Sequence, residues 1–164
     1  MANRHKELYA FIKRFAEEKK IESVLEVGGG ENPMSHLADN YLNVDINTSL
    51  SDTIHEDFTK MDLTSLAGKF DLVLALSVIE HCEGYEKFLK QVKKVRPKYN
   101  IISFFNKLSR EENFLIKKNR YGGNIWVNKY SQQKLEEFLK QIGISNYNFV
   151  EISRDKVLII CFSR

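Results

Sequence analysis

Short apolar runs alternate with amphipathic stretches along this chain of 164 residues, and that alternation limits the choice of fold more than any other feature. Apolar runs bounded by turn residues are typical of buried strands, and apolar residues at helical spacing are typical of surface helices. Elements that alternate in this way form a mostly parallel sheet with helices on both faces. We predict strands at residues 24–27, 41–45, 53–56, 70–76 and 100–105, and helices at residues 7–19, 34–38, 85–95 and 131–142.

The C-terminal part of the chain departs from this alternation. Residues 147–153 and 156–162 have the pattern of two strands, and the short turn at Arg154 and Asp155 between them predicts an antiparallel hairpin. The expected fold class is therefore α/β, a doubly wound, mostly parallel seven-stranded sheet with helices on both faces and a C-terminal antiparallel hairpin. Residues 106–130 are polar, aromatic and irregular, with room for one helical turn, and we interpret them as an insertion.

Length and composition indicate one globular domain spanning residues 1–164. The formal net charge of +3 is too small to require a nucleic acid or an anionic membrane as a partner. The two cysteines, Cys82 and Cys161, share no motif spacing, and the charged N-terminus leads into an amphipathic stretch and not into an apolar signal core. No apolar run approaches the roughly 18 residues of a membrane span. We expect a cytoplasmic protein, either a monomer or a weak homodimer.

Ligands of such sheets bind in the crevice at the carboxyl ends of the strands, so the residues after each strand are the first candidates for a site. The first strand contains Glu26 and ends in Gly28-Gly29-Gly30, where the chain can turn sharply and a ligand can approach the main chain. The second strand ends in Asp45, just under 20 residues beyond the first strand, at a position suited to binding the hydroxyls of a ribose. Together these features indicate a nucleotide-like cofactor.

In its motifs the sequence resembles the seven-stranded class I methyltransferases that use S-adenosylmethionine. Their first motif is matched by Val24-Leu25-Glu26-Val27-Gly28-Gly29-Gly30, although Asn32-Pro33 stands where a third glycine of the pattern would be. Their strand-end acid matches Asp45, and their adenine-contacting acid matches Asp57. Their fourth-strand signature matches residues 70–75, followed by Val78-Ile79-Glu80-His81. The resemblance is specific from Ser23 to about Pro97 and continues to the C-terminus only as a pattern of elements.

The resemblance implies S-adenosylmethionine as the cofactor, with S-adenosylhomocysteine as the product. Gly28 and Gly30 would approach the methionyl and ribose parts, and Glu26 would support the loop or meet the ammonium group. Asp45 would hold the ribose, Asp57 and Phe58 would contact the adenine, and the region of Ser77 would close over the methionine end. The implied cofactor-binding residues are Glu26, Gly28, Gly29, Gly30, Asn32, Asp45, Ile46, Asp57, Phe58 and Ser77.

Each of these assignments has a structural alternative. The glycines alone would also suit a plain tight connection, Asp45 a solvated strand end, and Asp57 a helix N-cap or surface acid. Histidine suits proton removal near neutral pH, so His81 is the candidate catalytic base. The alternative, which we favour from the sequence, is that His81 packs at the start of a helix. We predict no metal site, because the four histidines show no ligand spacing.

The acceptor side is the least constrained part of the sequence. Asn106, Tyr121 and Trp126 follow the fifth strand, where this family often builds its acceptor pocket, but a tryptophan in an insertion can also form a small core of its own. The basic residues in and just after the predicted helix at residues 85–95 have the pattern of a solvated face, and nucleic-acid binding through them is the less favoured interpretation: Lys87, Lys90, Lys93, Lys94, Arg96 and Lys98.

The resulting hypothesis is methyl transfer by in-line displacement to a small molecule or metabolite. The sequence leaves two rivals. One is a non-catalytic cofactor-binding or scaffold subunit with the same fold, since the chain is near the minimum length for it. The other is a nicotinamide-dependent oxidoreductase, which the missing Gly-x-Gly-x-x-Gly turn and the C-terminal hairpin disfavour.

Overall fold

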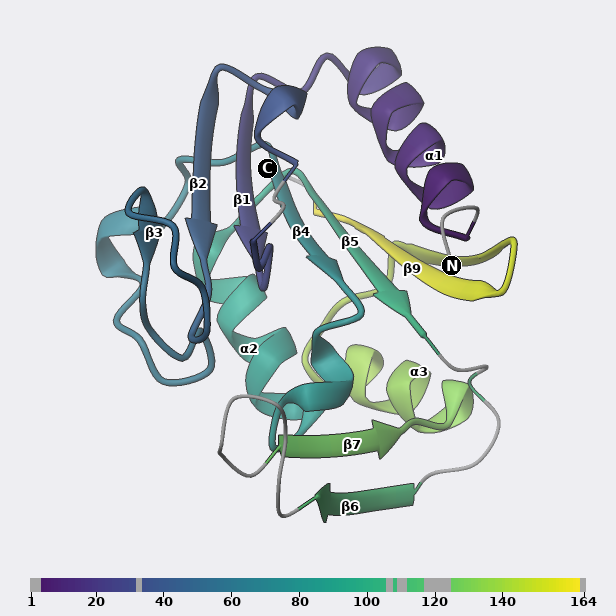
Figure 1. The fold of residues 1–164 in the computed structure, drawn as a ribbon. Helices are drawn as coiled ribbons and strands as arrows, with labels where there is room; N and C mark the ends of the chain where they lie inside the picture. Colours follow the sequence, from purple (N-terminus) through teal and green to yellow (C-terminus); the bar gives the residue numbers. More distant parts are fainter. Residues whose placement is uncertain (1–3, 32–33, 106–107, 109–111, 117–124, 163–164) are drawn as a thin grey trace.

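The central element of the computed structural model is a seven-stranded sheet with the order β3-β2-β1-β4-β5-β9-β8 (Figure 1). The structure describes residues 4–31, 34–105, 108, 112–116 and 125–162. The first five strands are all parallel, and β9 runs antiparallel to both β5 and β8. The sheet is built from β1 (Ser23–Val27), β2 (Asn40–Val44), β3 (Thr53–Ile54), β4 (Leu72–Leu76), β5 (Tyr99–Phe104), β8 (Tyr147–Ile152) and β9 (Asp155–Cys161). The predicted fold class is confirmed.

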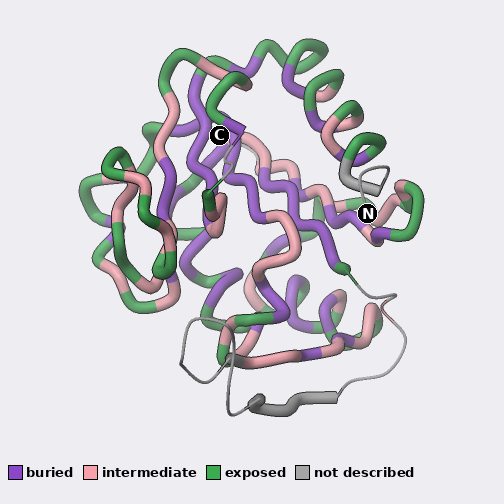
Figure 2. Tube along the Cα trace, in the orientation of Figure 1, coloured by how far each residue is buried: buried purple, intermediate pink, exposed green. Residues whose placement is uncertain are grey.

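Helices cover both faces of this sheet because its buried strands are apolar on both sides. On β4, Leu72 and Leu74 belong to the core cluster under α1 (Arg4–Lys19), whereas Val73 and Ala75 belong to the cluster under α2 (Tyr85–Val95) and α3 (Gln132–Gln141). Successive side chains of a strand point to opposite faces, so a continuous apolar run fills both layers at once. Figure 2 shows the central strands as the most buried part of the molecule. In the part of the chain that the structure describes, no helix is long and apolar enough to cross a membrane.

The bounds of α2 follow from its sequence. The fully buried side chains Phe88, Leu89, Val92 and Val95 recur three or four residues apart and form one apolar face. The helix ends at Arg96, which takes the left-handed conformation with φ +54°, and Pro97 follows. The predicted helix at residues 85–95 is confirmed.

After β1 the chain forms only a three-residue 3-10 helix, η1 (Ser35–Leu37), as the prediction of a short helix at residues 34–38 anticipated. Residues 32–33, which include Asn32, lie outside the described residues. No long helix therefore begins at the carboxyl end of β1 within the described chain, although doubly wound folds often place one there. The N-terminus of a long helix at this place would favour binding of an anionic group, so its absence from the described chain bears on which cofactor the site suits.

The insertion differs from its prediction. Instead of irregular chain with one helical turn, it contains the antiparallel pair β6 (Glu112–Ile116) and β7 (Ile125–Lys129). The strand β7 was missed because its fully buried residue is polar, Asn128, so apolar and polar residues do not alternate as in a half-buried strand. The hairpin turn is also one residue earlier than predicted, because Asp155 pairs with Ile152 and leaves Ser153 and Arg154 as the turn.

Candidate cofactor site

The glycine turn after β1 is held by the carboxyl end of β2 and the residue that follows it. The Gly28 N–H donates to the Val44 carbonyl (2.7 Å), the Gly29 N–H to Asn43 Oδ1 (3.2 Å) and the Gly30 N–H to Asp45 Oδ2 (2.8 Å). All three consecutive N–H groups are therefore used within the protein. A turn of this kind gives a ligand a close approach to the backbone but does not offer it a row of free donors.

Asp45 lies between the glycine turn and the loop after β2. Its Oδ1 accepts the Asn47 N–H (2.7 Å) and its Oδ2 accepts the Gly30 N–H. Each carboxylate oxygen can accept a second hydrogen bond, and the residue is only half-buried, so both oxygens can still accept bonds from a pair of ligand hydroxyls. The next residue, Ile46, is 62% exposed and adds an apolar surface beside this carboxylate.

Glu26 is directed at the loop after the glycine turn. It is buried, and its Oε2 accepts the Met34 N–H (2.8 Å) and the Tyr41 hydroxyl (2.5 Å). Burial raises the pKa of this carboxyl, and the Asp45 carboxylate raises it further, although the two hydrogen bonds oppose the shift. The geometry gives Glu26 the loop-supporting role, which is one of the two roles that the resemblance implied.

Replacing Glu26 by Gln should change how stability depends on pH. Because the folded-state pKa lies above the ordinary value, the native protein binds more protons than the unfolded chain just above the ordinary glutamate range. The contribution of Glu26 is thus fully present below that range and is lost as the pH rises through the folded-state pKa. We expect the free energy of unfolding of the wild type, relative to Glu26→Gln, to fall between pH 4 and pH 8. Urea unfolding across this range measures it, with the exposed Glu17→Gln as control. A difference that rises with pH would contradict the assignment.

The structure gives Asp57 and Phe58 local roles. Burial raises the pKa of Asp57, but hydrogen bonds from Lys60 and Thr59 outweigh it, so the pKa lies below its usual range. The contacts are the Thr59 N–H (3.0 Å) and hydroxyl (2.7 Å) on Oδ1 and the Lys60 ammonium (2.9 Å) on Oδ2. The Phe58 ring lies in the core, 5.1 Å from the Phe88 ring between centroids. The Phe58 carbonyl accepts a hydrogen bond from the Gln91 amide (2.9 Å), and the contact of Phe58 with adenine stays a prediction.

The loop after β4 packs against the glycine turn. Ser77 takes a positive φ of +54°, which is uncommon outside glycine and often marks functional sites, and its N–H donates to the Ser103 carbonyl and Oγ, both at 3.1 Å. The Val78 side chain lies so close to Gly28 that a Cβ on Gly28 would stand 2.3 Å from Val78 Cγ2. The glycine turn and the β4 loop thus form two neighbouring walls at the carboxyl edge of the sheet.

His81 contacts the insertion through one of its ring nitrogens. It ends the 3-10 helix η3 (Ile79–His81) and is exposed, and its Nδ1 lies 2.9 Å from the Trp126 carbonyl oxygen on β7. A carbonyl oxygen can only accept, so Nδ1 carries the proton in this hydrogen bond. In the neutral ring Nε2 then holds the free lone pair. Both interpretations of His81 are compatible with this contact, because the residue fixes a loop and also presents a competent base.

Further polar contacts hold the insertion on η3. The Asn128 amide donates to the Cys82 carbonyl (2.6 Å), and the Tyr130 hydroxyl donates to the Ile79 carbonyl (2.9 Å). The buried Glu80 accepts the Phe105 N–H through Oε1 (2.5 Å) and so connects η3 to the end of β5. The structure therefore brings η3, β7 and the end of β5 together (Figure 1), and the Trp126 carbonyl lies against His81 of η3.

Two residues of this site were missed from the sequence. Phe105 is 51% exposed and follows β5 directly, a position that the strand-end rule would have selected. Asn43 holds the Gly29 N–H from within β2, and no sequence signal distinguishes it from another polar strand residue. Of the predicted acceptor residues only Trp126 is described, since Asn106 and Tyr121 lie outside the described residues.

Comparisons with known proteins agree with this arrangement. The family model described as "Methyltransferase domain" matches residues 2–148, whereas none of the curated proteins matches. The solved structures that share the fold include the following three. The methyltransferase domain of bacterial CtHen1-CN is 17% identical, with a TM-score of 0.64 over 98% of this chain and 100% of that chain. The 1,6-didemethyltoxoflavin-N1-methyltransferase of Burkholderia thailandensis, solved with bound 1,6-didemethyltoxoflavin and S-adenosylhomocysteine, is 12% identical, with a TM-score of 0.66 over 99% and 85%.

The third structure is an S-adenosylmethionine-dependent methyltransferase from Mesorhizobium loti, which is 9% identical, with a TM-score of 0.63 over 87% of this chain and 91% of that chain. At such identities the structural likeness establishes the fold, and the family match, which covers most of the chain, establishes the membership. The chain belongs to the methyltransferase-domain family and has the fold of the class I, S-adenosylmethionine-dependent methyltransferases.

Proposed function

We propose that this protein transfers a methyl group from S-adenosylmethionine to a small molecule or metabolite. The observation that carries the proposal is the glycine turn, whose three N–H groups are all bonded to the β2 side of the site. Dinucleotide sites bind a pyrophosphate with free N–H groups at the start of a helix that follows the first strand. Here those donors are consumed, and within the described residues only η1 follows. The turn therefore suits a cofactor without phosphate and disfavours a nicotinamide dinucleotide.

The residues present fit the parts of S-adenosylmethionine. Asp45 has spare acceptor capacity for two ribose hydroxyls, and the exposed Ile46 offers an apolar surface next to it. Gly30 permits close approach, Glu26 supports the loop through Met34, and Ser77 and Val78 form the neighbouring wall against Gly28. The bound sulfonium would supply an activated methyl group with a good leaving group. The work of the protein is then to align the acceptor and exclude water, which can supply up to about 11 kcal/mol in well-aligned systems.

His81 is the proposed base when the acceptor is a hydroxyl or a protonated amine. Its Nδ1–H donates to the Trp126 carbonyl, which orients the ring and leaves Nε2 to accept a proton from the acceptor. Trp126 would flank the acceptor from β7, and the exposed Phe105 ring adds a second aromatic surface at the end of β5. A flat small molecule suits these surfaces. The Burkholderia neighbour, whose bound 1,6-didemethyltoxoflavin is a small molecule, supports this acceptor class.

Isothermal titration calorimetry of the purified protein tests the cofactor assignment. We expect S-adenosylmethionine and S-adenosylhomocysteine to bind with micromolar dissociation constants and NAD to show no heat of binding. A folded sample that binds neither sulfur compound would overturn the proposal, and NAD binding would favour the oxidoreductase. Release of S-adenosylhomocysteine in an acceptor screen then separates an enzyme from a non-catalytic scaffold, which would bind the cofactor without turnover.

A further inference from the structure

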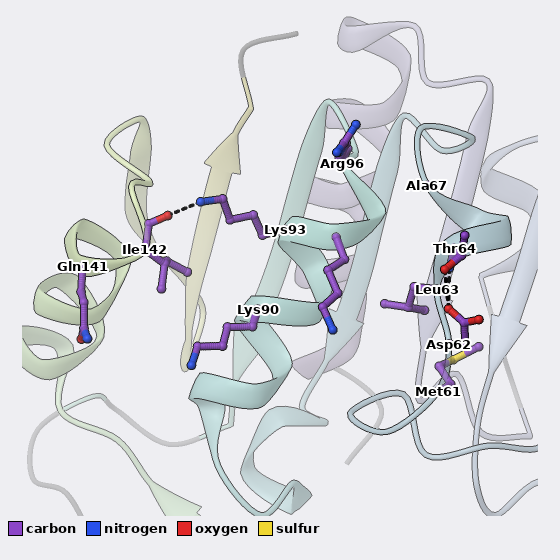
Figure 3. A pocket seen from close by; sticks show the side chains of 11 residues that line it. Met61, Asp62, Leu63, Thr64, Ala67, Lys90, Lys93, Arg96, Gln141 and Ile142 are labelled. Carbon is purple, nitrogen blue, oxygen red and sulfur yellow. Dashed lines mark hydrogen bonds between the residues drawn. The ribbon is translucent and has the colours of Figure 1, made fainter.

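A groove lies on the α2 side of the sheet (Figure 3). It has a volume of about 870 Å³ and runs from the end of α3 across the last turns of α2 to the 3-10 helix η2 (Thr64–Leu66). Because α2 ends just before β5 begins, this stretch of α2 lies toward the amino ends of the strands, opposite the carboxyl edge. We call it the cationic groove, and its lining residues of interest are Met61, Leu63, Ala67, Lys90, Lys94 and Arg96.

The rim of the cationic groove carries uncompensated positive charge. Lys90, Lys93, Lys94 and Arg96 line it together with a single carboxylate, Asp62, so its surplus of three positive charges equals the formal net charge of the whole chain. None of the four cations forms an ion pair with a carboxylate of the described residues. The Asp62 carboxylate is itself occupied, since it accepts the Thr64 N–H (2.9 Å) and hydroxyl (2.6 Å). The groove therefore favours an anionic occupant.

The floor of the groove decides between classes of anionic partner. Its apolar lining residues are aliphatic, with Met61, the largely buried Leu63 and Ala67 on one side of α2 and Ile142 on the other, and the lining contains no aromatic ring (Figure 3). Single-stranded nucleic acids are usually bound where cations accompany aromatic rings on which bases stack. An aliphatic floor instead suits leucine-like side chains. None of the lining residues belongs to a strand, so an added β-strand would find no sheet edge to pair with.

We propose that the cationic groove binds an acidic amphipathic helix of a partner protein. The apolar face of the helix packs on Met61, Leu63, Ala67 and Ile142, and its flanking carboxylates meet the lysines of α2. Helices recognised in grooves present such anchors three or four residues apart. The groove lining includes neither Asp45 nor Gly28, although the Met61 N–H donates to the Asp57 carbonyl (3.1 Å) and so joins the groove to the Asp57 side of the candidate cofactor site. The inference does not rest on the proposed function.

Among the described residues, neither Lys90 nor Lys94 forms a side-chain hydrogen bond or an ion pair, and neutralising Lys90 removes the cation–π contact of its Nζ with the Phe138 ring, 5.9 Å from the ring centroid. Lys93 is left in place because its ammonium donates to the Ile142 carbonyl (2.5 Å) at the end of α3 (Figure 3). The test variant is therefore Lys90→Gln/Lys94→Gln. The matched control is Lys6→Gln/Lys13→Gln, which removes two exposed lysines of α1, outside the groove. Glutamine keeps the helix propensity of lysine, and both variants lose the same charge.

Fluorescence anisotropy with three labelled probes tests the proposal. The probes are a helical peptide with leucine on one face and glutamate on the other, a peptide of the same composition in scrambled order, and a single-stranded uridine oligonucleotide. Of the three probes, we expect only the amphipathic peptide to bind the wild-type protein tightly. Its affinity should fall at least about tenfold in Lys90→Gln/Lys94→Gln and stay unchanged in the control variant. S-adenosylhomocysteine affinity should be equal in all three proteins. The proposal would be overturned if the amphipathic peptide did not bind, or if the scrambled peptide or the oligonucleotide bound equally well. It would also be overturned if both variants lost the same affinity for the amphipathic peptide.

Discussion

Gly28→Ala is expected to destabilise the protein by roughly 2 to 5 kcal/mol. Gly28 has a φ of +75°, a conformation that costs a residue with a side chain about 1–2 kcal/mol. The added Cβ would also stand 2.3 Å from Val78 Cγ2 and 2.9 Å from Val78 Cγ1, and relieving such overpacking costs about 1–3 kcal/mol. Urea unfolding measures the change. Because the clash pushes the β4 loop away from the glycine turn, S-adenosylhomocysteine binding should weaken as well.

Two further variants separate the backbone cost from the clash. Gly30 has a similar φ of +59°, but a Cβ there meets no described atom within 4 Å, so Gly30→Ala should cost only about 1–2 kcal/mol. Adding Val78→Ala to Gly28→Ala removes the clashing methyl groups. The loss in free energy of unfolding of the double variant should therefore be smaller than the sum of the losses of the two single variants. Equal losses in Gly28→Ala and Gly30→Ala, with additive behaviour at Val78, would show that the close packing is not a determinant of stability.

The sequence predicted the parts of the fold that depend on local pattern. The β4 strand and α2 are apolar runs of the right period, so their places followed from burial alone, and the glycines of β1 and Asp45 followed from the rule that sites form at strand ends. The strand β7 could not be predicted in this way. The amide N–H2 of its buried residue Asn128 donates to the carbonyl of Cys82, a contact between segments 46 residues apart that no local pattern records.

The candidate site divides along the same line. Which carbonyl, amide or carboxylate oxygen accepts each glycine N–H depends on the register of β1 and β2, and only the folded sheet sets that register. The environment of Phe58 also depends on tertiary packing. Its place after an acid suggested a ligand contact, but the folded structure packs its ring against Phe88 in the core. Sequence identified the residue types at the crevice, and tertiary packing determined which of their atoms remain available to a ligand.

Asp45→Ala is expected to weaken S-adenosylhomocysteine binding by at least about 100-fold. Hydrogen bonds to a charged group contribute about 1.5–3 kcal/mol each, and the proposed pair of ribose hydroxyls would lose two of them, where 1.4 kcal/mol corresponds to a factor of ten. The variant also leaves the Gly30 N–H without its acceptor, which loosens the turn beside the cofactor. Calorimetric titration measures the affinity, and urea unfolding establishes how much of the loss comes from stability.

Asp52→Ala is the matched control, because Asp52 is an exposed acid of the same loop between β2 and β3, and its Oδ1 accepts a 3.3 Å hydrogen bond from the hydroxyl of the neighbouring Ser51. It should bind S-adenosylhomocysteine as the wild type does, since it removes the same charge without touching the glycine turn. If both variants lost affinity equally, the effect would be a general one of charge. If a folded Asp45→Ala bound as tightly as the wild type, the ribose would have to be held elsewhere, and the assignment of Asp45 would fail while the family membership stood.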